Sequence, residues 1–252
     1  MKFEGNYIQI PRFILERLET DLLRIPIFIY LYRKVSLDDT IGCCLDDIIY
    51  NVGYSNIKIK TNIINRINTT LSYFQDNGLI EIDNNYNKLS QNYYVRLYPN
   101  KDYFDAPDSF CQILLSEVDK ILNYKDYITL DKNERNVMPD KLLYILTYIR
   151  MNKLRRADNQ EAYPNRKPEF FFKQIKDIAE DLEINKKTVS SGIVILEKLN
   201  IIVSKKMKRY KDVKGNWHTG ITLFVDKYDG WEQELEWGVS LLNSGKKIIY
   251  KQ

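Results

Sequence analysis

The sequence predicts a mixed α+β fold, mainly helical, in which one order of elements occurs twice. Three observations support this prediction. Apolar residues recur at helical spacing, long helical stretches end at turn residues that lead into apolar strands, and the same order returns in the second half of the chain. Because the chain's 252 residues exceed the usual size of one domain, roughly 100–200 residues, we expect two domains. They cover residues 1–105 and 106–252.

The first copy contains extended segments and helical stretches in a fixed order. Its expected elements are a strand over 7–11, helices over 22–32, 46–53 and 61–77, and strands over 79–82 and 93–97. Apolar side chains three and four positions apart indicate which face of the longest helix is buried. The expected inward side chains are Ile64, Ile67, Leu71 and Phe74. Gly78 ends that helix, because glycine readily adopts the backbone conformation of a helix stop.

The second copy repeats this order. Its expected elements are a strand over 110–114, helices over 142–149, 177–184 and 186–199, and strands over 201–203 and 221–225. The expected inward side chains of its last helix are Val189, Ile193, Leu196 and Leu199. Asn200 ends this helix 122 residues after Gly78, and Lys214-Gly215-Asn216 supplies turn chemistry between the last two strands.

This order of elements is that of a winged helix, a helix-turn-helix followed by a β-hairpin called the wing. The sequence therefore predicts two tandem winged-helix domains. A polar segment bounded by prolines, 99–108, is the expected linker between them. A further segment, 151–168, carries five basic residues and is predicted to be an insertion in the second copy that forms a mobile or DNA-facing loop.

Candidate DNA contacts gather in the second copy. A helix-turn-helix places its second helix in the major groove, so the exposed side of that helix should be polar and basic. Asn185 is a favourable N-cap for this helix. Between Val203 and Trp217 there are six basic residues and one acidic residue, a local charge of +5 that favours phosphate contact. The candidate residues are Lys186, Lys187, Thr188, Ser190, Ser191, Lys205, Lys206, Lys208, Arg209, Lys211, Trp217 and His218. A solvated helix face without a partner is the alternative.

The first copy offers fewer candidates. Lys58, Lys60, Asn62, Asn65 and Arg66 give its longest helix a basic and amide-rich side, whereas its wing is nearly neutral. Asparagine can bind adenine through two hydrogen bonds, but it is common throughout this chain. The first copy is therefore expected either to contact DNA or to serve as a dimerisation surface.

Several classes of protein are not expected. The single histidine and the lack of metalloprotease or hydrolase motifs predict a protein that is not an enzyme and uses no cofactor or metal. Cys43, Cys44 and Cys111 have no metal-ligand spacing and are expected to be reduced and buried. No apolar stretch approaches the roughly 18 residues that span a bilayer, so we expect a cytoplasmic protein outside the membrane. An acidic segment over 226–236 is predicted to pack as a helix on the second copy or on a partner chain.

Three stretches of the first half carry a resemblance to a known family. They are Tyr7-Ile8-Gln9-Ile10-Pro11-Arg12, Gly53-Tyr54-Ser55, and Phe74-Gln75-Asp76-Asn77-Gly78-Leu79-Ile80. Together with the apolar helix between them, these stretches resemble the winged-helix region of replication initiators from Firmicute plasmids and phages, of the RepA type and the related DnaD-like organisers. The resemblance implies binding to repeated origin sites, often as a homodimer, and recruitment of host replication proteins.

The expected function is sequence-specific binding of double-stranded DNA that initiates or controls replication of a plasmid, phage or other mobile element. Two alternatives stay open. A transcriptional regulator needs the same groove contacts, and a protein–protein adaptor would use its winged helices only for packing.

Overall fold

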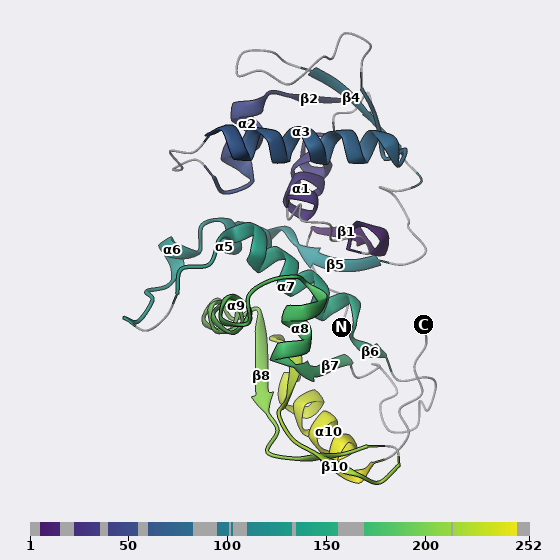
Figure 1. The fold of residues 1–252 in the computed structure, drawn as a ribbon, viewed down its shortest axis with the longest axis vertical. Coiled ribbons are helices and arrows are strands. Elements are labelled where there is room, and N and C mark those ends of the chain that lie inside the picture. Colours follow the sequence, from purple (N-terminus) through teal and green to yellow (C-terminus); the bar gives the residue numbers. More distant parts are fainter. Residues whose placement is uncertain are drawn as a thin grey trace. The chain divides into compact units, whose positions relative to one another are not determined.

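The structure, a computed structural model, describes residues 6–15, 23–35, 40–54, 60–82, 95–100, 102, 110–132, 135–155, 169–212 and 214–245 (Figure 1). These residues form a mixed α/β structure with small antiparallel sheets. The chain divides into two compact units. The amino-terminal unit comprises Gly5–Asn123 and Met138–Tyr144, and the carboxy-terminal unit comprises Met1–Glu4, Tyr124–Val137 and Ile145–Gln252.

In the described residues, the amino-terminal unit contains two antiparallel sheets and the helices beside them. Its strands are β1 (Tyr7–Pro11), β2 (Ile41–Cys43), β3 (Ile80–Ile82), β4 (Val95–Pro99) and β5 (Phe110–Leu114). Its helices are the short 3₁₀ helix η1 (Arg12–Ile14), α1 (Arg24–Lys34), α2 (Leu45–Asn51), α3 (Lys60–Asp76) and α5 (Leu115–Leu122). One sheet has the order β2-β4-β3, and the other pairs β1 with β5.

Helix α1 lies in the core of this unit. Every residue from Ile25 to Leu31 is buried, as expected for a helix that is apolar on most of its faces. Helix α3 instead buries one face, and its Phe74 meets Phe28 edge to face with ring centroids 6.5 Å apart. Ile64, which the apolar spacing placed in the core, is only half-buried.

The carboxy-terminal unit is built around a four-stranded sheet of order β6-β7-β11-β8. The strands are β6 (Leu154–Arg155), β7 (Glu169–Gln174), β8 (Ile202–Lys206) and β11 (Ile221–Asp226), with β9 (Tyr210–Lys211) and β10 (Trp217–His218) paired separately as a hairpin. The helices are α6 (Tyr124–Tyr127), α8 (Ile175–Asp181), α9 (Lys186–Lys198) and α10 (Trp231–Ser244). Helix α7 (Pro139–Met151) contributes residues to both units.

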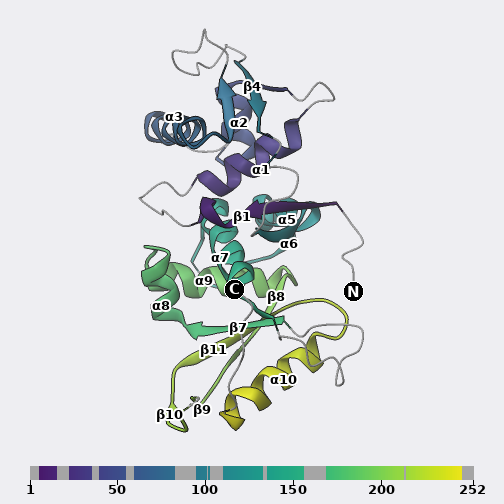
Figure 2. The same cartoon turned by 90° about the vertical axis from the view of Figure 1, so that its right-hand side faces the viewer.

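Strand β11 is buried along its whole length, because helices cover both faces of its sheet. Figure 2 shows α9 and α10 on opposite sides of β8 and β11. Leu223 belongs to a hydrophobic cluster with Phe170 and Leu242 of α10. On the other face, Phe224 stacks on Phe171 with ring centroids 5.8 Å apart. A helix therefore packs on the second copy as predicted, but it covers 231–244, and Asp226 at the start of the predicted segment belongs to β11.

The two units end corresponding helices with the same turn. Gly53 after α2 and Glu183 after α8 both have positive φ, 84° and 51°, and they lie 130 residues apart. Gly78 after α3 and Asn200 after α9 also have positive φ, 69° and 56°, and they lie 122 residues apart. In all four turns, the next residue donates its N–H to the carbonyl five positions earlier. The sequence repeat is therefore a repeat of local structure, with eight more residues between the two turns in the amino-terminal unit.

The structure also differs from the sequence-based expectations. The sequence did not predict β2 and β7, the strands that precede the short helices α2 and α8. It treated β1 and β5 as corresponding strands of separate copies, but they pair with each other, with Tyr7 opposite Leu114. The predicted domain boundary near residue 105 lies outside the described residues, and β5 and α5 beyond it belong to the amino-terminal unit.

Candidate nucleic-acid interface

Helix α9 begins at a side-chain cap. Asn185 Oδ1 accepts a hydrogen bond from the N–H of Lys187 at 2.9 Å, which confirms the predicted N-cap. The left-handed residue Glu183 in the preceding turn lets α9 follow α8 at once. The first N–H groups of a helix lack helical partners, so this end of α9 carries a partial positive charge.

The two faces of α9 differ in chemistry. The predicted inward residues are buried: Val189, Ile193, Leu196 and Leu199. Among the predicted DNA contacts on this helix, Lys186, Lys187 and Ser190 are exposed, and Thr188 and Ser191 are half-buried. The helix thus packs on its unit through one side and leaves two lysines and a serine at its start accessible to solvent.

Two of the predicted contacts, Lys205 and Lys206, lie on opposite faces of strand β8. Lys205 lies opposite Leu223 of β11, and Lys206 lies opposite Thr222. Directly opposed residues point to the same face of a sheet. Lys205 therefore lies on the face covered by α10, and Lys206 lies on the face where α9 packs. Both lysines are exposed, but they do not share one face.

Asp212 organises the turn of the hairpin β9–β10. Its Oδ1 accepts hydrogen bonds from the N–H groups of Lys214 and Asn216 at 2.9 and 2.8 Å. Its Oδ2 lies 2.9 Å from His218 Nε2. The hydrogen bond with His218, followed by those from Asn216, holds the pKa of Asp212 below its usual range. Gly215 has a φ of 89°, as the predicted turn chemistry requires.

The hairpin also orders two aromatic pairs. The guanidinium carbon of Arg209 lies 4.6 Å from the ring centroid of Trp217. Tyr210 stacks on His218 with ring centroids 5.3 Å apart. Trp217 and His218 are adjacent in β10, so their side chains point to opposite faces of the hairpin.

The acidic side chains among these elements are occupied by hydrogen bonds. Glu197 of α9 accepts the N–H of Ser204 at 2.8 Å, and Asp212 accepts the bonds described above. Lys198 is paired with Asp131 at 3.3 Å. The exposed basic side chains of α9, β8 and the hairpin are Lys186, Lys187, Lys205, Lys206, Lys208, Arg209 and Lys214, and Lys211 is half-buried. The accessible charge of this region is therefore positive.

The amino-terminal unit uses one of its predicted contacts internally. Arg66 Nη2 pairs with Asp140 Oδ2 at 3.3 Å, and Arg66 Nη1 donates to Tyr54 Oη at 3.3 Å. Asp140 is fully buried, and this burial raises its pKa even though Tyr54 and Arg66 favour the ionised form. DNA contact by Arg66 stays a prediction, and in this structure its guanidinium is bonded to Asp140 and Tyr54 within the unit.

The other predicted contacts of the amino-terminal unit are described only in part. Asn62 and Asn65 are exposed on α3. Lys60 is the first residue of α3, and its side chain lies outside the described part of the structure, as does Lys58 entirely. The predicted first wing, residues 83–92, also lies outside the described residues.

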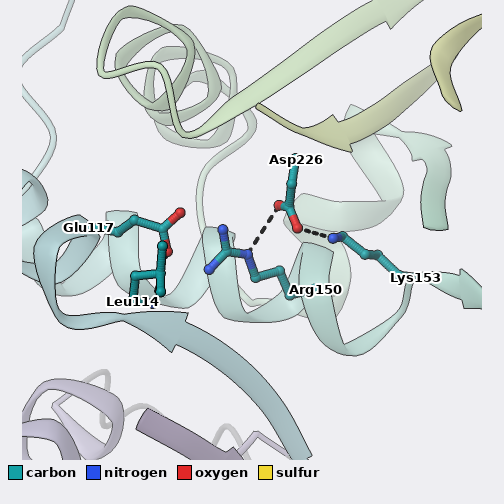
Figure 3. Close-up of polar contacts among 5 residues, drawn as sticks. All are labelled: Leu114, Glu117, Arg150, Lys153 and Asp226. Atoms are coloured by element: carbon teal, nitrogen blue, oxygen red, sulfur yellow. Dashed lines mark hydrogen bonds and ion pairs between the residues drawn. The ribbon is translucent and has the colours of Figure 1, made fainter. Parts of the chain in front are cut away.

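The predicted insertion, 151–168, contains a buried lysine. Lys153 forms an ion pair with Asp226, which also pairs with Arg150 Nε at 3.1 Å (Figure 3). All three side chains are almost completely buried. The expectation that this segment forms a mobile or DNA-facing loop is therefore wrong for Lys153, because a buried carboxylate holds it. Residues 156–168 lie outside the described residues.

Sequence reasoning missed a second polar cluster in this unit. Lys173 of β7 donates to Tyr148 Oη of α7 at 2.9 Å, and both groups bond Asp181 at the end of α8. The hydrogen bonds to Lys173 and Tyr148 outweigh the burial of Asp181, so its pKa is lowered. The run Phe170-Phe171-Phe172 was the sequence signal for β7, and an apolar run of that kind would have placed Lys173 at the end of a strand.

Metal clusters and membrane-spanning helices are both absent from the described residues. No group of three or more histidine, cysteine, aspartate or glutamate side chains there is arranged to hold a metal ion. Among the described helices, none has the length and apolar character needed to cross a membrane. Cys43, Cys44 and Cys111 form no disulfide and lie in buried positions, as the sequence predicted.

No protein-family model, curated protein or solved structure matches this chain. The interpretation of the region around α9 therefore depends on its geometry and charge.

Proposed function

We propose that the carboxy-terminal unit is a winged helix that binds double-stranded DNA, with α9 in the major groove and the hairpin β9–β10 as the wing. The order of its elements supports the proposal: β7, α8, α9, β8, hairpin, β11. In the sheet, β11 lies between β7 and β8. In this order a helix-turn-helix is followed by a strand, a hairpin and a returning strand, as in a winged helix.

The observation that carries the proposal is the chemistry at the start of α9. Lys186, Lys187 and Ser190 are exposed directly after the Asn185 cap, while the opposite face of the helix is buried. Helices that read the major groove contact base edges with their first residues. Lysine and serine side chains suit both phosphate oxygens and base edges. The start of α9 therefore has the polarity and the position that such contacts need.

Phosphate contacts from the sheet and the wing complete the proposed interface. Lys206 lies on the face of the sheet where α9 packs, and Lys208 and Arg209 follow it into the hairpin. Cations beside a recognition helix neutralise phosphates next to the groove and fix the register of the helix.

The biological role that we propose is initiation or control of replication of a plasmid, phage or other mobile element. It rests on the resemblance of the first hundred residues, not on the geometry of α9. A map of bound sites distinguishes this role from transcriptional control, because an initiator occupies sites at an origin and a regulator occupies sites that overlap a promoter.

A triple substitution tests duplex binding by α9. The ligand is a duplex selected by the full chain from a random pool. The variant Lys186→Ala, Lys187→Ala, Lys206→Ala should bind this duplex at least about tenfold more weakly, because base and phosphate contacts are lost together. The control Lys120→Ala, Lys125→Ala, Lys132→Ala removes the same charge from residues outside α9, β8 and the hairpin, and it should stay within about twofold of the parent. Equal losses for both variants, or a pool from which no duplex is enriched, would contradict the proposal.

A further inference from the structure

Trp217 is an exposed aromatic side chain on a polar hairpin. It is 51% exposed. The other two tryptophans are half-buried in α10. The ring centroids of Trp237 and Phe170 lie 5.2 Å apart, and Lys227 Nζ lies 3.8 Å from the ring centroid of Trp231. The indole of Trp217 is therefore the tryptophan surface that this unit presents to a ligand.

The hairpin has two chemically different faces. Lys211 lies directly opposite Trp217 in the β9–β10 register, so the two side chains share a face. The guanidinium of Arg209 lies over the Trp217 ring on that face. Tyr210 and His218 oppose each other on the other face. The ring centroid of Tyr210 also lies 6.5 Å from that of Phe172, which packs against the hydrophobic cluster. Tyr210 thus anchors the hairpin on one face. On the other face the exposed indole lies beside Arg209, and the stem of the half-buried Lys211 lies against Gly245 at the end of α10.

The backbone around this face is fixed. Met207 is buried at the base of the hairpin, and its N–H donates to the Ile221 carbonyl at 2.9 Å. At the tip, the Asp212 N–H donates to the Asn216 carbonyl at 2.8 Å. A ring held by such a frame loses little conformational freedom when a ligand stacks on it, which favours binding.

An aromatic ring beside cations that can reach phosphate is the combination by which proteins hold single-stranded nucleic acid. A base stacks on a protein ring only when it leaves its neighbours in the strand, which an unpaired base does far more readily than a paired one. We infer that Trp217, with Arg209 and Lys211, binds an unpaired base of single-stranded DNA. The inference deepens the proposed function and rests on nucleic-acid binding by the same unit.

Binding of a single strand tests this inference. The probe is a fluorescent oligothymidylate of about 15 nucleotides, long enough to fill a single-strand site. The full chain carrying Trp217→Ala should bind it at least about fivefold more weakly, since stacking contributes about 1–3 kcal/mol per base. Trp217→Phe keeps an aromatic ring and should stay within about threefold of the parent. Affinity for the selected duplex should change by less than about twofold in both variants.

The outcomes separate the two proposals. Unchanged oligothymidylate affinity in Trp217→Ala overturns the inference, and so does an equal loss for duplex and single strand, which would place Trp217 on duplex DNA. The variant Lys186→Ala, Lys187→Ala, Lys206→Ala tests the proposed function instead. If that variant keeps duplex affinity while Trp217→Ala loses the single strand, duplex reading by α9 fails and the inference about Trp217 holds.

Discussion

At Asp226, burial and charge act on one side chain. Burial alone would raise its pKa, but Arg150 and Lys153 outweigh that effect and hold the pKa below its usual range. Only 4% of the Asp226 side chain is exposed, and both cations are equally well shielded from water. A carboxylate in this position is needed because it compensates two charges that would otherwise lose their hydration.

Asp226→Asn should lower the free energy of unfolding by about 3–5 kcal/mol at neutral pH, because it leaves buried cations without their carboxylate. Urea unfolding measures this change. The matched control is Asp119→Asn, which removes the partner of Arg33 at 2.9 Å in an ion pair whose Asp119 side chain is 56% exposed. That change should cost less than about 1 kcal/mol, since water replaces an exposed ion pair.

The loss at Asp226 should also depend on pH. Because the folded-state pKa of Asp226 lies below the unfolded value of about 3.8, its contribution is complete above that value and disappears as pH falls through the folded-state pKa. The difference in unfolding free energy between the parent and Asp226→Asn should therefore shrink below pH 4. A difference that stays constant or grows on acidification would show that the carboxylate is not the stabilising form.

Single residues differ in how far the sequence indicates their role. Asn185 was predicted as an N-cap because a cap is a local feature. Asp226 was assigned to an acidic helix, but it is the last residue of β11 and its partners come from α7 and the residues after it. No spacing along the chain encodes such a pairing, because its members lie more than 70 residues apart.

At the scale of the element, the turns after α2 and α3 give two glycines with different surroundings. Gly53 and Gly78 both have positive φ. A Cβ at Gly53 would lie 3.0 Å from Cγ of Pro139, whereas a Cβ at Gly78 would meet nothing within 4 Å. Glycine is therefore favoured at position 53 by both the positive φ and the close packing of Pro139, and at position 78 by the positive φ alone.

Gly53→Ala should therefore destabilise the protein more than Gly78→Ala. The change at Gly78 should cost about 1 kcal/mol, the strain of a left-handed alanine. The change at Gly53 should cost about 2–4 kcal/mol, because crowding against the proline ring adds to that strain. Thermal or urea unfolding shows which variant loses more stability. Equal losses of unfolding free energy would contradict the close packing of Pro139 against Gly53.

The sequence was most informative for helices and their ends. The apolar spacing gave α3 and α9 almost to the residue, and Gly78 and Asn200 marked their ends. It did not give β2, which has only three residues, or β7, whose apolar residues form a continuous run and not an alternation. It also did not give the pairing of β1 with β5, since strand register depends on partners distant in sequence.

Across the whole molecule, one local plan occurs twice with different surface chemistry. On α3 the exposed amides Asn62 and Asn65 stand beside an arginine that is paired with Asp140. On α9 the exposed residues at the helix start are lysines and a serine, with further cations on β8 and the hairpin. This contrast is the reason for assigning duplex binding to the carboxy-terminal unit. The sequence predicted the contrast from the distribution of charged residues alone.

The salt dependence of duplex affinity tests that assignment most directly. Each phosphate contact adds about 0.9 to the slope of log affinity against log salt concentration. The variant Lys186→Ala, Lys187→Ala, Lys206→Ala should therefore give a line less steep than the parent by about 0.9 for every lysine that contacts a phosphate, while Lys120→Ala, Lys125→Ala, Lys132→Ala leaves the slope unchanged. A line for the first variant that runs parallel to that of the parent would contradict the account.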